Sequence, residues 1–202
     1  MTRTITHYHQ QAKHFQSLYD SVSAQQIHQD WSYLIERLTP GFALDIGAGS
    51  GRDARWLASK GWQVVAAEPA QALRELAQKS SGPEVLWSAA SLPELIELPT
   101  TPTTYQLILL SAVWMHIPPS ERKLAFQTIA ERLATDGLIV ISLRFGPSDS
   151  KRPMYEVSVA EVQQLAAACN LRTEVLSPAS TSDKLGRQEV SWQTLLLKQE
   201  LA

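Results

Sequence analysis

Short apolar runs alternate with amphipathic segments along most of this chain. Runs with the length and character of strands lie at residues 42–46, 62–67, 84–87, 105–111, 138–143, 172–176 and 190–198. Segments with apolar residues at helical spacing lie at residues 23–38, 52–60, 70–79, 92–98, 118–133 and 158–169. The alternation of strand-like runs with segments of helical spacing predicts strands that are connected by helices.

The order of these elements predicts a doubly wound α/β fold. Strands joined by helices pair in parallel, and the helices cover both faces of the sheet. The runs at 105–111 and 138–143 are apolar at nearly every position, as strands buried on both faces must be. A polar loop, 177–187, joins the last two strands. Because a short loop cannot make a parallel crossover, we expect these two strands to pair antiparallel at one edge of the sheet.

The first forty residues precede the first strand. Ser23 can cap a helix that carries Trp31 on its apolar face, and the Pro-Gly pair at 40–41 ends that helix. We therefore expect an N-terminal helical cap at residues 1–40, followed by one α/β domain at residues 41–202.

Composition excludes several classes of protein. The chain has 202 residues, of which 44% are hydrophobic, and a net charge of −2. These values suit one globular domain and provide no basic surface for nucleic acid or an anionic membrane. The basic pair Lys151-Arg152 is expected to lie in a solvated loop. No apolar run is long enough to span a bilayer, and the N-terminus lacks the apolar core of a signal peptide.

Cys169 is the only cysteine. An internal disulfide and a cysteine-based metal cluster are therefore excluded. The His, Asp and Glu residues show no convincing metal-ligand spacing, so we expect no metal. The thiol follows three alanines in an apolar helical segment, where we expect it to pack in the core. This cysteine usage fits a reducing, cytoplasmic location.

The strongest chemical signal is the sequence Asp45-Ile46-Gly47-Ala48-Gly49-Ser50-Gly51-Arg52, between the first strand and the next helix. Its three glycines allow positive φ and let a ligand approach the backbone closely. The loop opens a helix whose N-terminal amides attract polar or anionic ligand groups. Glu68 ends the second strand, where a carboxylate can accept hydrogen bonds from both hydroxyls of a ribose. Together these features predict an adenosine-type site at the carboxyl ends of the strands.

Two ligand classes fit such a site. A nicotinamide dinucleotide is usually bound by G-x-G-x-x-G/A, but here Arg52 occupies the last position of that motif. Its bulky side chain would obstruct the pyrophosphate, and Asp45 would repel it. The same carboxylate suits the ammonium and sulfonium charges of S-adenosylmethionine. Charge therefore favours S-adenosylmethionine, with an NAD(P)-dependent oxidoreductase as the alternative.

The segment Asp45–Gly51 resembles the glycine-rich first motif of class I S-adenosylmethionine-dependent methyltransferases. The likeness extends over residues 42–198, because that family has a mostly parallel seven-stranded sheet with an antiparallel last strand, in three α/β/α layers. The resemblance implies transfer of a methyl group from S-adenosylmethionine by in-line displacement. No separate substrate domain is present in the sequence, so the expected acceptor is a small molecule. Whether O, N, S or C receives the methyl group stays open.

The resemblance also assigns roles to residues at the cofactor site. Asp45 would hold the methionyl end, Glu68 would bind the ribose hydroxyls, and Pro69 would pack against adenine. The expected cofactor-binding residues are Asp45, Gly47, Ala48, Gly49, Gly51, Arg52, Glu68, Pro69, Ser111 and Ala112. Many members carry an acidic residue after the third strand to receive the adenine amino group. This chain has Ser88 and Ser91 there, so we expect adenine to be read by one of these hydroxyls or by the backbone.

Substrate contacts are expected beyond the fourth and fifth strands. In the family, the segment after the fourth strand borders both the sulfonium and the acceptor, which makes Trp114 and His116 candidate substrate residues. His116 is also the candidate general base, because its reference pKa lies near neutrality. Core packing for Trp114 and a backbone hydrogen bond for His116 are the alternatives. Arg144 ends the fifth strand, where it could bind an acceptor carboxylate or phosphate or make a structural salt bridge. Tyr8 or Tyr19 could fold over the cofactor.

Two further alternatives concern the activity itself. The protein could bind the cofactor without turnover, since Asp45, the glycines and Glu68 argue for binding and not for catalysis. A nucleic-acid methyltransferase is disfavoured by the net negative charge and by the lack of an Asn-Pro-Pro-Tyr-like motif after the fourth strand.

Overall fold

The computed structural model describes residues 2–177 and 181–200 of the chain. Its strands are β1 (Phe42–Ile46), β2 (Gln63–Ala67), β3 (Val85–Ser88), β4 (Tyr105–Leu110), β5 (Leu133–Phe145), β6 (Leu171–Val175), β7 (Thr181–Ser182) and β8 (Ser191–Gln199). Its helices are α1 (Thr2–Gln10), α2 (Ala12–Asp20), α3 (Ala24–Ile27), α4 (Ser32–Ile35), α5 (Arg52–Ser59), α6 (Gln71–Lys79), the 3-10 helix η1 (Trp114–His116), α7 (Pro119–Glu131) and α8 (Val159–Ala168).

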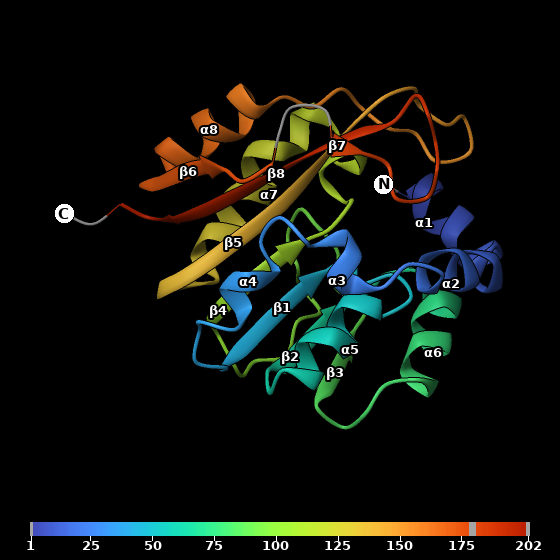
Figure 1. The fold of residues 1–202 in the computed structure, drawn as a ribbon, viewed down its shortest axis with the longest axis horizontal. Coiled ribbons are helices and arrows are strands. Elements are labelled where there is room, and N and C mark those ends of the chain that lie inside the picture. Colours follow the sequence, from blue (N-terminus) through green and yellow to red (C-terminus); the bar gives the residue numbers. More distant parts are fainter. Residues whose placement is uncertain (1, 178–180, 201–202) are drawn as a thin grey trace.

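One twisted sheet runs through the molecule in the order β3-β2-β1-β4-β5-β8-β6, with the short β7 paired to β8 (Figure 1). The strands from β3 to β5 pair in parallel. Strand β8 is antiparallel to both of its neighbours, β5 and β6. The mostly parallel doubly wound sheet and the antiparallel pairing of the last two long strands are thus confirmed.

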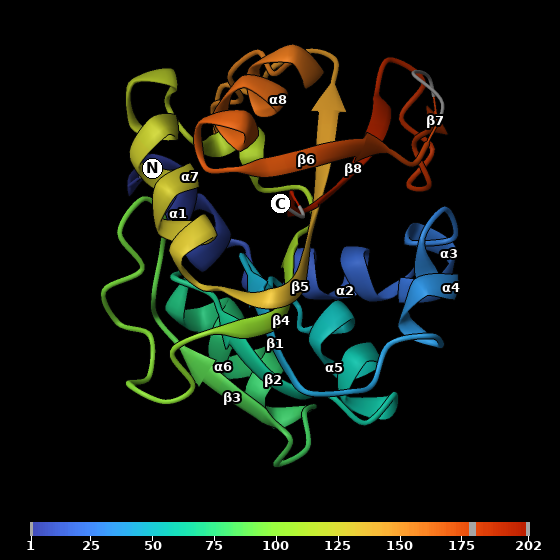
Figure 2. The same ribbon diagram turned by 90° about the vertical axis from the view of Figure 1, so that its left-hand side faces the viewer.

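Helices cover both faces of this sheet and give three layers. Figure 2 shows α7 and α8 on one side and α3, α4 and α5 on the other. On the first side, Phe126 and Val162 pack against the sheet, and on the second side Trp31 and Leu57 do so. Helices α1 and α2 pack on α6 around Phe15, beside the sheet (Figure 1). No helix in the described residues is long and apolar enough to cross a membrane.

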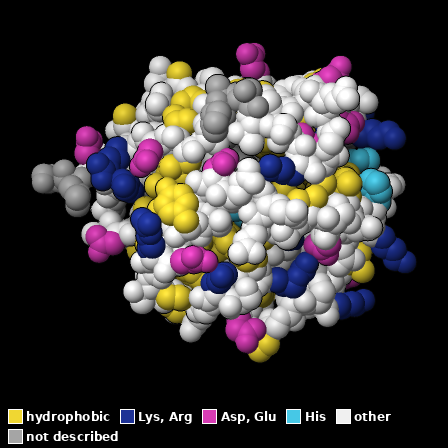
Figure 3. Space-filling model, in the orientation of Figure 1, with side chains coloured by type: hydrophobic (Ala, Val, Ile, Leu, Met, Phe, Trp, Pro, Cys, Tyr) yellow, Lys and Arg dark blue, Asp and Glu magenta, His cyan; other side chains and the backbone are white. Residues whose placement is uncertain are grey.

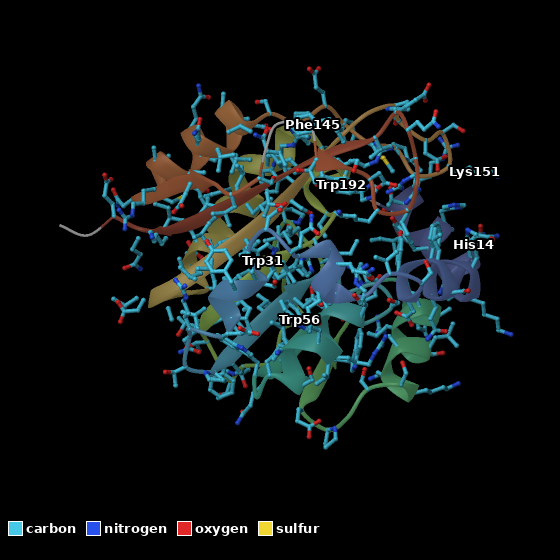
Figure 4. All side chains as sticks on the ribbon, viewed as in Figure 1. His14, Trp31, Trp56, Phe145, Lys151 and Trp192 are labelled. Atoms are coloured by element: carbon cyan, nitrogen blue, oxygen red, sulfur yellow. The ribbon has the colours of Figure 1, made fainter. Side chains whose placement is uncertain are left out.

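The prediction of one continuous helix over residues 23–38 is wrong. Ser23 does cap a helix, in a reciprocal capping box with Gln26, but α3 ends at Ile27 and α4 begins only at Ser32. The break lets His28 turn inward, where it accepts a hydrogen bond at 3.1 Å on Nδ1 from Nε1 of Trp31. Figure 4 shows Trp31 beside α4 and close to Trp56 of α5.

The helix expected at residues 92–98 is also absent. This segment is a series of turns, because Leu95 has a left-handed φ of 54° that an α-helix cannot contain. Leu92 and Leu95 are both buried, while Ile96 is exposed. The apolar residues that suggested a helical face anchor an irregular loop instead.

Strand β5 is longer than the predicted 138–143. Beyond its pairing with β4, it continues beside β8 as far as the pair Phe145↔Ser191. The part of β5 beyond its pairing with β4 carries Ser142 and Arg144, and both line a cavity.

Candidate active site

The carboxyl ends of β1, β2, β4 and β5 meet at one edge of the sheet and enclose two adjoining cavities. The first, which we name the β2 cavity, lies between the glycine loop (residues 47–51), the end of β2 and helix α1. The second, the β5 cavity, lies between the same loop, the ends of β5 and β8, and the segment 181–187. The residues that line both cavities are Tyr8, Tyr19, Gly47, Ser111 and Ala112.

The glycine loop adopts a backbone that favours glycine. Gly47, Gly49 and Gly51 have φ values of 69°, 56° and 77°. A Cβ atom on Gly47 would lie 2.6 Å from Cγ2 of Val113, and one on Gly51 would lie 2.9 Å from the ring of Trp87. Gly47 and Gly49 line the β2 cavity, whereas Gly51 lies at the start of α5 and is not among the lining residues.

Glu68 places a buried carboxylate in the wall of the β2 cavity. Its Oε2 accepts a hydrogen bond from Gly49 N at 2.9 Å, and its Oε1 accepts one from Ala70 N at 2.8 Å. Burial raises the pKa of this carboxyl, although both hydrogen bonds oppose the rise. Each carboxylate oxygen can accept a further hydrogen bond, so Glu68 can still bind a hydroxyl in the cavity.

Asp45 is a second buried carboxylate, but it lines neither cavity directly. Burial raises its pKa well above the usual range, and repulsion from Asp53 adds to the rise. Within residues 2–177 and 181–200, its Oδ2 has no hydrogen-bond partner. A buried acceptor without a partner costs about 1–3 kcal/mol, so this oxygen marks a place where a donor would be favourable.

Asp53 differs from Asp45 because it is fully paired. Arg52 donates to it through Nε at 2.7 Å and through Nη2 at 2.9 Å, and Nε2 of His28 lies 3.1 Å from its Oδ2. Although burial opposes the change, His28 and Arg52 lower the pKa of Asp53. All three residues line the β5 cavity beside the glycine loop.

The end of β4 brings a strained residue to the shared wall. Ala112 has a φ of 61°, a conformation rare for residues other than glycine. Its backbone N–H donates to Oγ of Ser142 at 2.8 Å, which ties the end of β4 to β5. Such strain of about 1–3 kcal/mol is held by the surrounding structure and is typical of functional sites.

A hydrogen-bond network crosses the shared wall at Tyr8. The Tyr8 hydroxyl accepts from Nη1 of Arg152 at 3.0 Å and from the Tyr19 hydroxyl at 3.2 Å. Its own proton can therefore point to Nε2 of His116, 3.4 Å away. Nδ1 of His116 lies 3.1 Å from the carbonyl of Pro153, which can only accept, so Nδ1 carries the hydrogen.

His116 is consequently a neutral acceptor. Burial and the positive charges of Arg152 and Arg144 together lower its pKa to about 4, although the hydrogen bond to the carbonyl of Pro153 opposes the change. Its side chain lines the β2 cavity, beside Val113 and Ala112. The backbone hydrogen bond that was the alternative role expected of His116 is present.

The C-terminal end of α2 is joined to the glycine loop. Asp20 accepts from the Ser50 hydroxyl at 2.7 Å and from Nη2 of Arg55 at 3.0 Å. Nη1 of Arg52 also reaches the carbonyl of Tyr19 at 3.4 Å. These contacts hold Tyr19 over Gly49, whose Cβ position would lie 3.5 Å from the tyrosine ring.

Basic side chains gather in the wall of the β5 cavity. Arg144 on β5 lies opposite Trp192 on β8, and both line the cavity together with Arg152 and Arg187 (Figure 4 labels Trp192). Arg187 donates to Asp183 at 2.6 Å and 2.9 Å, and Nε1 of Trp192 donates to the same carboxylate at 2.8 Å. Although burial opposes the change, these hydrogen bonds lower the pKa of Asp183 to about 2.

Most of the expected site residues line one of the two cavities, and a few do not. The cavity walls include Gly47, Ala48, Gly49, Arg52, Glu68, Pro69, Ser111, Ala112, His116 and Arg144, and of the two serines considered for adenine they include Ser91. Ser88 instead accepts from Ala90 N at 3.1 Å and donates to the carbonyl of Glu97. Trp114 is fully buried in the core against Phe126 and is not among the residues that line the two cavities.

Several lining residues were missed by sequence reasoning. The pair Lys151-Arg152 was expected to be solvated, but only Lys151 is exposed, and the Arg152 guanidinium lies 5.3 Å from the centre of the Phe15 ring. Alternation along β5 is a signal that could have found Ser142, two residues before Arg144 on the same face. No local pattern marks Arg187. Within the described ranges, no three His, Cys, Asp or Glu side chains gather as a metal site requires.

A family model described as "Methyltransferase domain" matches residues 19–174, more than half of the chain. The chain therefore belongs to this methyltransferase family, and it has the class I methyltransferase fold. No curated protein matches the sequence at a significant level.

Solved structures with this fold cover nearly the whole chain. One is a 1,6-didemethyltoxoflavin-N1-methyltransferase from Burkholderia thailandensis, with a TM-score of 0.72 at 19% identity over 98% of this chain and 88% of that chain. A TehB-like S-adenosylmethionine-dependent methyltransferase from Corynebacterium glutamicum has a TM-score of 0.69 at 18% identity over 96% and 99%. Magnesium protoporphyrin IX methyltransferase from Synechocystis has a TM-score of 0.65 at 17% identity over 87% and 79%. At these identities the likeness describes the fold.

Proposed function

We propose that this protein is an S-adenosylmethionine-dependent methyltransferase that acts on a small-molecule acceptor. The observation that carries the proposal is the buried Glu68 carboxylate beside the glycine loop, in the wall of the β2 cavity. Two of the similar structures support it, since the didemethyltoxoflavin enzyme was solved with bound S-adenosylhomocysteine and the protoporphyrin enzyme with bound S-adenosylmethionine.

The residues of the β2 cavity fit this cofactor. Glu68 would bind the ribose hydroxyls, and the glycine loop leaves space where a Cβ atom would stand. Pro69 and Leu92 provide apolar walls for adenine, with Ser91 as the nearby polar group. The partnerless Oδ2 of Asp45 fits a role in holding the methionyl ammonium, directly or through a water.

The bound cofactor would supply a methyl group on a positively charged sulfur. The protein's task is then to hold the acceptor in line with that group, which can contribute up to about 7–11 kcal/mol to the lowering of the barrier. Gly47, Ser111 and Ala112 border both cavities, and we place the reacting atoms beside them. The β5 cavity is the acceptor site in this arrangement.

For His116 we propose a positioning role through Tyr8. With a pKa of about 4, the ring stays neutral at physiological pH and holds the Tyr8 hydroxyl through its Nε2. The same low pKa makes it a weak proton acceptor, so orientation of Tyr8 is favoured over general-base catalysis.

We also propose that α1 and α2 form the cap over the cofactor. Thr4, Ile5, Tyr8 and Tyr19 line the β2 cavity, which supports a cap at residues 2–20. The remainder of the expected cap, α3 and α4, packs on the sheet beside α5. A small acceptor also agrees with the surface, because the face drawn in Figure 3 shows acidic and basic side chains interspersed.

Calorimetric titration with S-adenosylmethionine, S-adenosylhomocysteine and NADH tests the proposal. We expect micromolar affinity for both adenosyl ligands and none for NADH. Glu68→Gln should weaken both adenosyl ligands at least tenfold, because a carboxylate hydrogen-bonded to the ribose contributes about 1.5–3 kcal/mol. The matched control is Glu75→Gln, since Glu75 is exposed on α6 and lines neither cavity.

Turnover is a separate readout. Release of S-adenosylhomocysteine in the presence of acceptor mixtures would distinguish an enzyme from a protein that only binds the cofactor. Binding of NADH without binding of either adenosyl ligand would refute the proposal in favour of the oxidoreductase.

A further inference from the structure

Arg144 is a buried cation whose side-on edge is unused. The residue is 8% exposed and lines the β5 cavity near the end of β5. Its Nη1 donates to the carbonyl of Pro147 at 3.0 Å. Its Nε is buried and has no hydrogen-bond partner among the residues that the structure describes. Nε and Nη2 form the edge of a guanidinium that binds an oxyanion through two parallel hydrogen bonds.

The other arginines of this wall are already paired with carboxylates. Arg52 pairs with Asp53, Arg152 with Asp149, and Arg187 with Asp183. For Arg144, no ion pair is formed within the described ranges, and Lys184, the fifth cation of the wall, is exposed. The β5 cavity therefore holds one buried positive charge without a counter-charge in contact with it.

A buried charge of this kind is unfavourable unless a counter-charge and hydrogen-bond partners bind it. Removing an ion from water costs several kcal/mol, which only good pairing and hydrogen bonding recover. Burial lowers the pKa of Arg144, and the charges of Arg187 and Arg152 lower it further, although Asp183 opposes the change. The wall is thus arranged to attract an anion from solvent.

The apolar residues of the same wall indicate what kind of molecule would carry the anion. Met115, Met154, Leu185 and Trp192 line the same cavity and present apolar surface. A free inorganic anion would leave this surface uncovered, whereas an oxyanion on an apolar body would fill it.

We infer that the methyl acceptor is a small molecule with an apolar body and one oxyanion group, a carboxylate or a phosphoryl group, which binds the Nε–Nη2 edge of Arg144. This inference rests on the proposed function. The anion lies at the end of β5, and the methyl-accepting atom lies toward Ser111 and Ala112, where the two cavities meet. Arg144 is a specificity-determining residue in this arrangement.

Calorimetry on the protein saturated with S-adenosylhomocysteine tests the inference, with benzoate, phenyl phosphate and the neutral benzamide as probes. We expect one of the two anions to bind and benzamide to bind at least tenfold more weakly. Arg144→Gln should lose at least tenfold in affinity for that anion, and Arg144→Lys should lose less. Arg172→Gln, an exposed arginine on β6, is the matched control and should bind as the wild type does.

The affinity for S-adenosylhomocysteine distinguishes a specific role of Arg144 in anion binding from a structural role. All three variants should bind S-adenosylhomocysteine within about twofold of wild type. Equal binding of benzamide and the anions, unchanged anion binding in Arg144→Gln, or no anion binding by the wild type would each overturn the inference. Parallel loss of cofactor and anion binding in Arg144→Gln would also overturn it. If the wild type binds no S-adenosylhomocysteine, the proposed function fails, and the same titrations without that ligand still decide the role of Arg144.

Discussion

The two cavities of this molecule differ in both charge and origin. The β2 cavity is built around the acidic Glu68, with Asp45 buried close by, and burial raises the pKa of both carboxyls. The β5 cavity is built around Arg144, with Arg152 and Arg187 beside it, and burial and these like charges lower the pKa of Arg144. Among the described residues, the buried lining charge that forms no ion pair is thus negative in the β2 cavity and positive in the β5 cavity.

This difference matches the two ligands that we propose. A cationic methyl donor is favoured beside buried carboxylates, and an anionic acceptor is favoured beside buried guanidinium groups. At an effective dielectric constant of about 20, opposite unit charges 4 Å apart attract by about 4 kcal/mol, so a contact of this kind would favour each ligand in its own cavity.

The largest effect is expected from Gly47→Ala, because Gly47 lines both cavities. Alanine would adopt a φ of 69° and place its Cβ 2.6 Å from Cγ2 of Val113. We expect a loss of about 2–4 kcal/mol in the free energy of unfolding, measured by chemical denaturation. Affinity for S-adenosylhomocysteine should fall more than a hundredfold.

Two further variants separate strain from contact. Gly186→Ala has nearly the same φ, 78°, but no atom within 4 Å of its Cβ position, so it should cost only about 1 kcal/mol. Adding Val113→Ala to Gly47→Ala should restore the part of the loss due to contact. Equal costs for the two glycine variants would contradict the close approach of Gly47 and Val113.

Asp45→Asn should produce opposite effects on binding and stability. Affinity for S-adenosylhomocysteine should fall by about thirtyfold, because a charge-assisted hydrogen bond is lost. The unliganded protein should gain about 1–2 kcal/mol, because a buried charge with a partnerless Oδ2 is removed. A raised pKa in the folded state means that this charge destabilises the fold as the pH rises, so the gain should increase with pH above the unfolded pKa.

Denaturation with and without ligand, at several pH values, measures both effects of Asp45→Asn. Asp136→Asn, at an exposed position, is the control and should leave stability and binding unchanged. A loss of stability in unliganded Asp45→Asn would show that the carboxylate is structural and would weaken the contrast between the cavities.

The contrast also explains what the sequence could predict. The β2 cavity depends on a contiguous loop and on Glu68 one strand later, so a local pattern predicts the ligand class that we propose for it. The β5 cavity combines positions 144, 152 and 187, which only the long pairing of β5 with β8 and the folding of two loops bring together. Loop residues carry no periodicity, and a basic pair such as Lys151-Arg152 looks the same whether it is solvated or buried.

The predicted strands and helices show the same limit of local sequence patterns. Central strands such as β4 were predicted close to their observed positions because strands buried on both faces are apolar at nearly every position. The helix over 23–38 failed because apolar spacing cannot reveal that His28 turns inward to accept from Trp31 and lie beside Asp53. Trp114 was ambiguous for a related reason, since an aromatic residue after a strand can face either a cavity or the core.

The smallest effect is expected for His116, which lies beside Ala112 in the wall of the β2 cavity. Its pKa responds to the arginines of the β5 cavity. Its pKa of about 4 in the folded protein is below the reference value of about 6.5, so between these values the unfolded chain binds a proton that the folded protein does not. Stability should therefore fall as the pH is lowered through this window, by about 1–2 kcal/mol between pH 7 and pH 5. His116→Gln should lose this part of the pH dependence, while His14→Gln, at an exposed site on α2, should keep it (Figure 4).

NMR titration of His116 then links the boundary to the β5 cavity. Because the charge of Arg144 contributes to the low pKa, Arg144→Gln should raise the pKa of His116, while Arg172→Gln should leave it unchanged. A bound oxyanion at Arg144 should raise it in the same direction, by neutralising the same charge. If the pKa of His116 responds to neither change, burial alone sets it, and the positive potential that we assign to the β5 cavity does not reach the wall it shares with the β2 cavity.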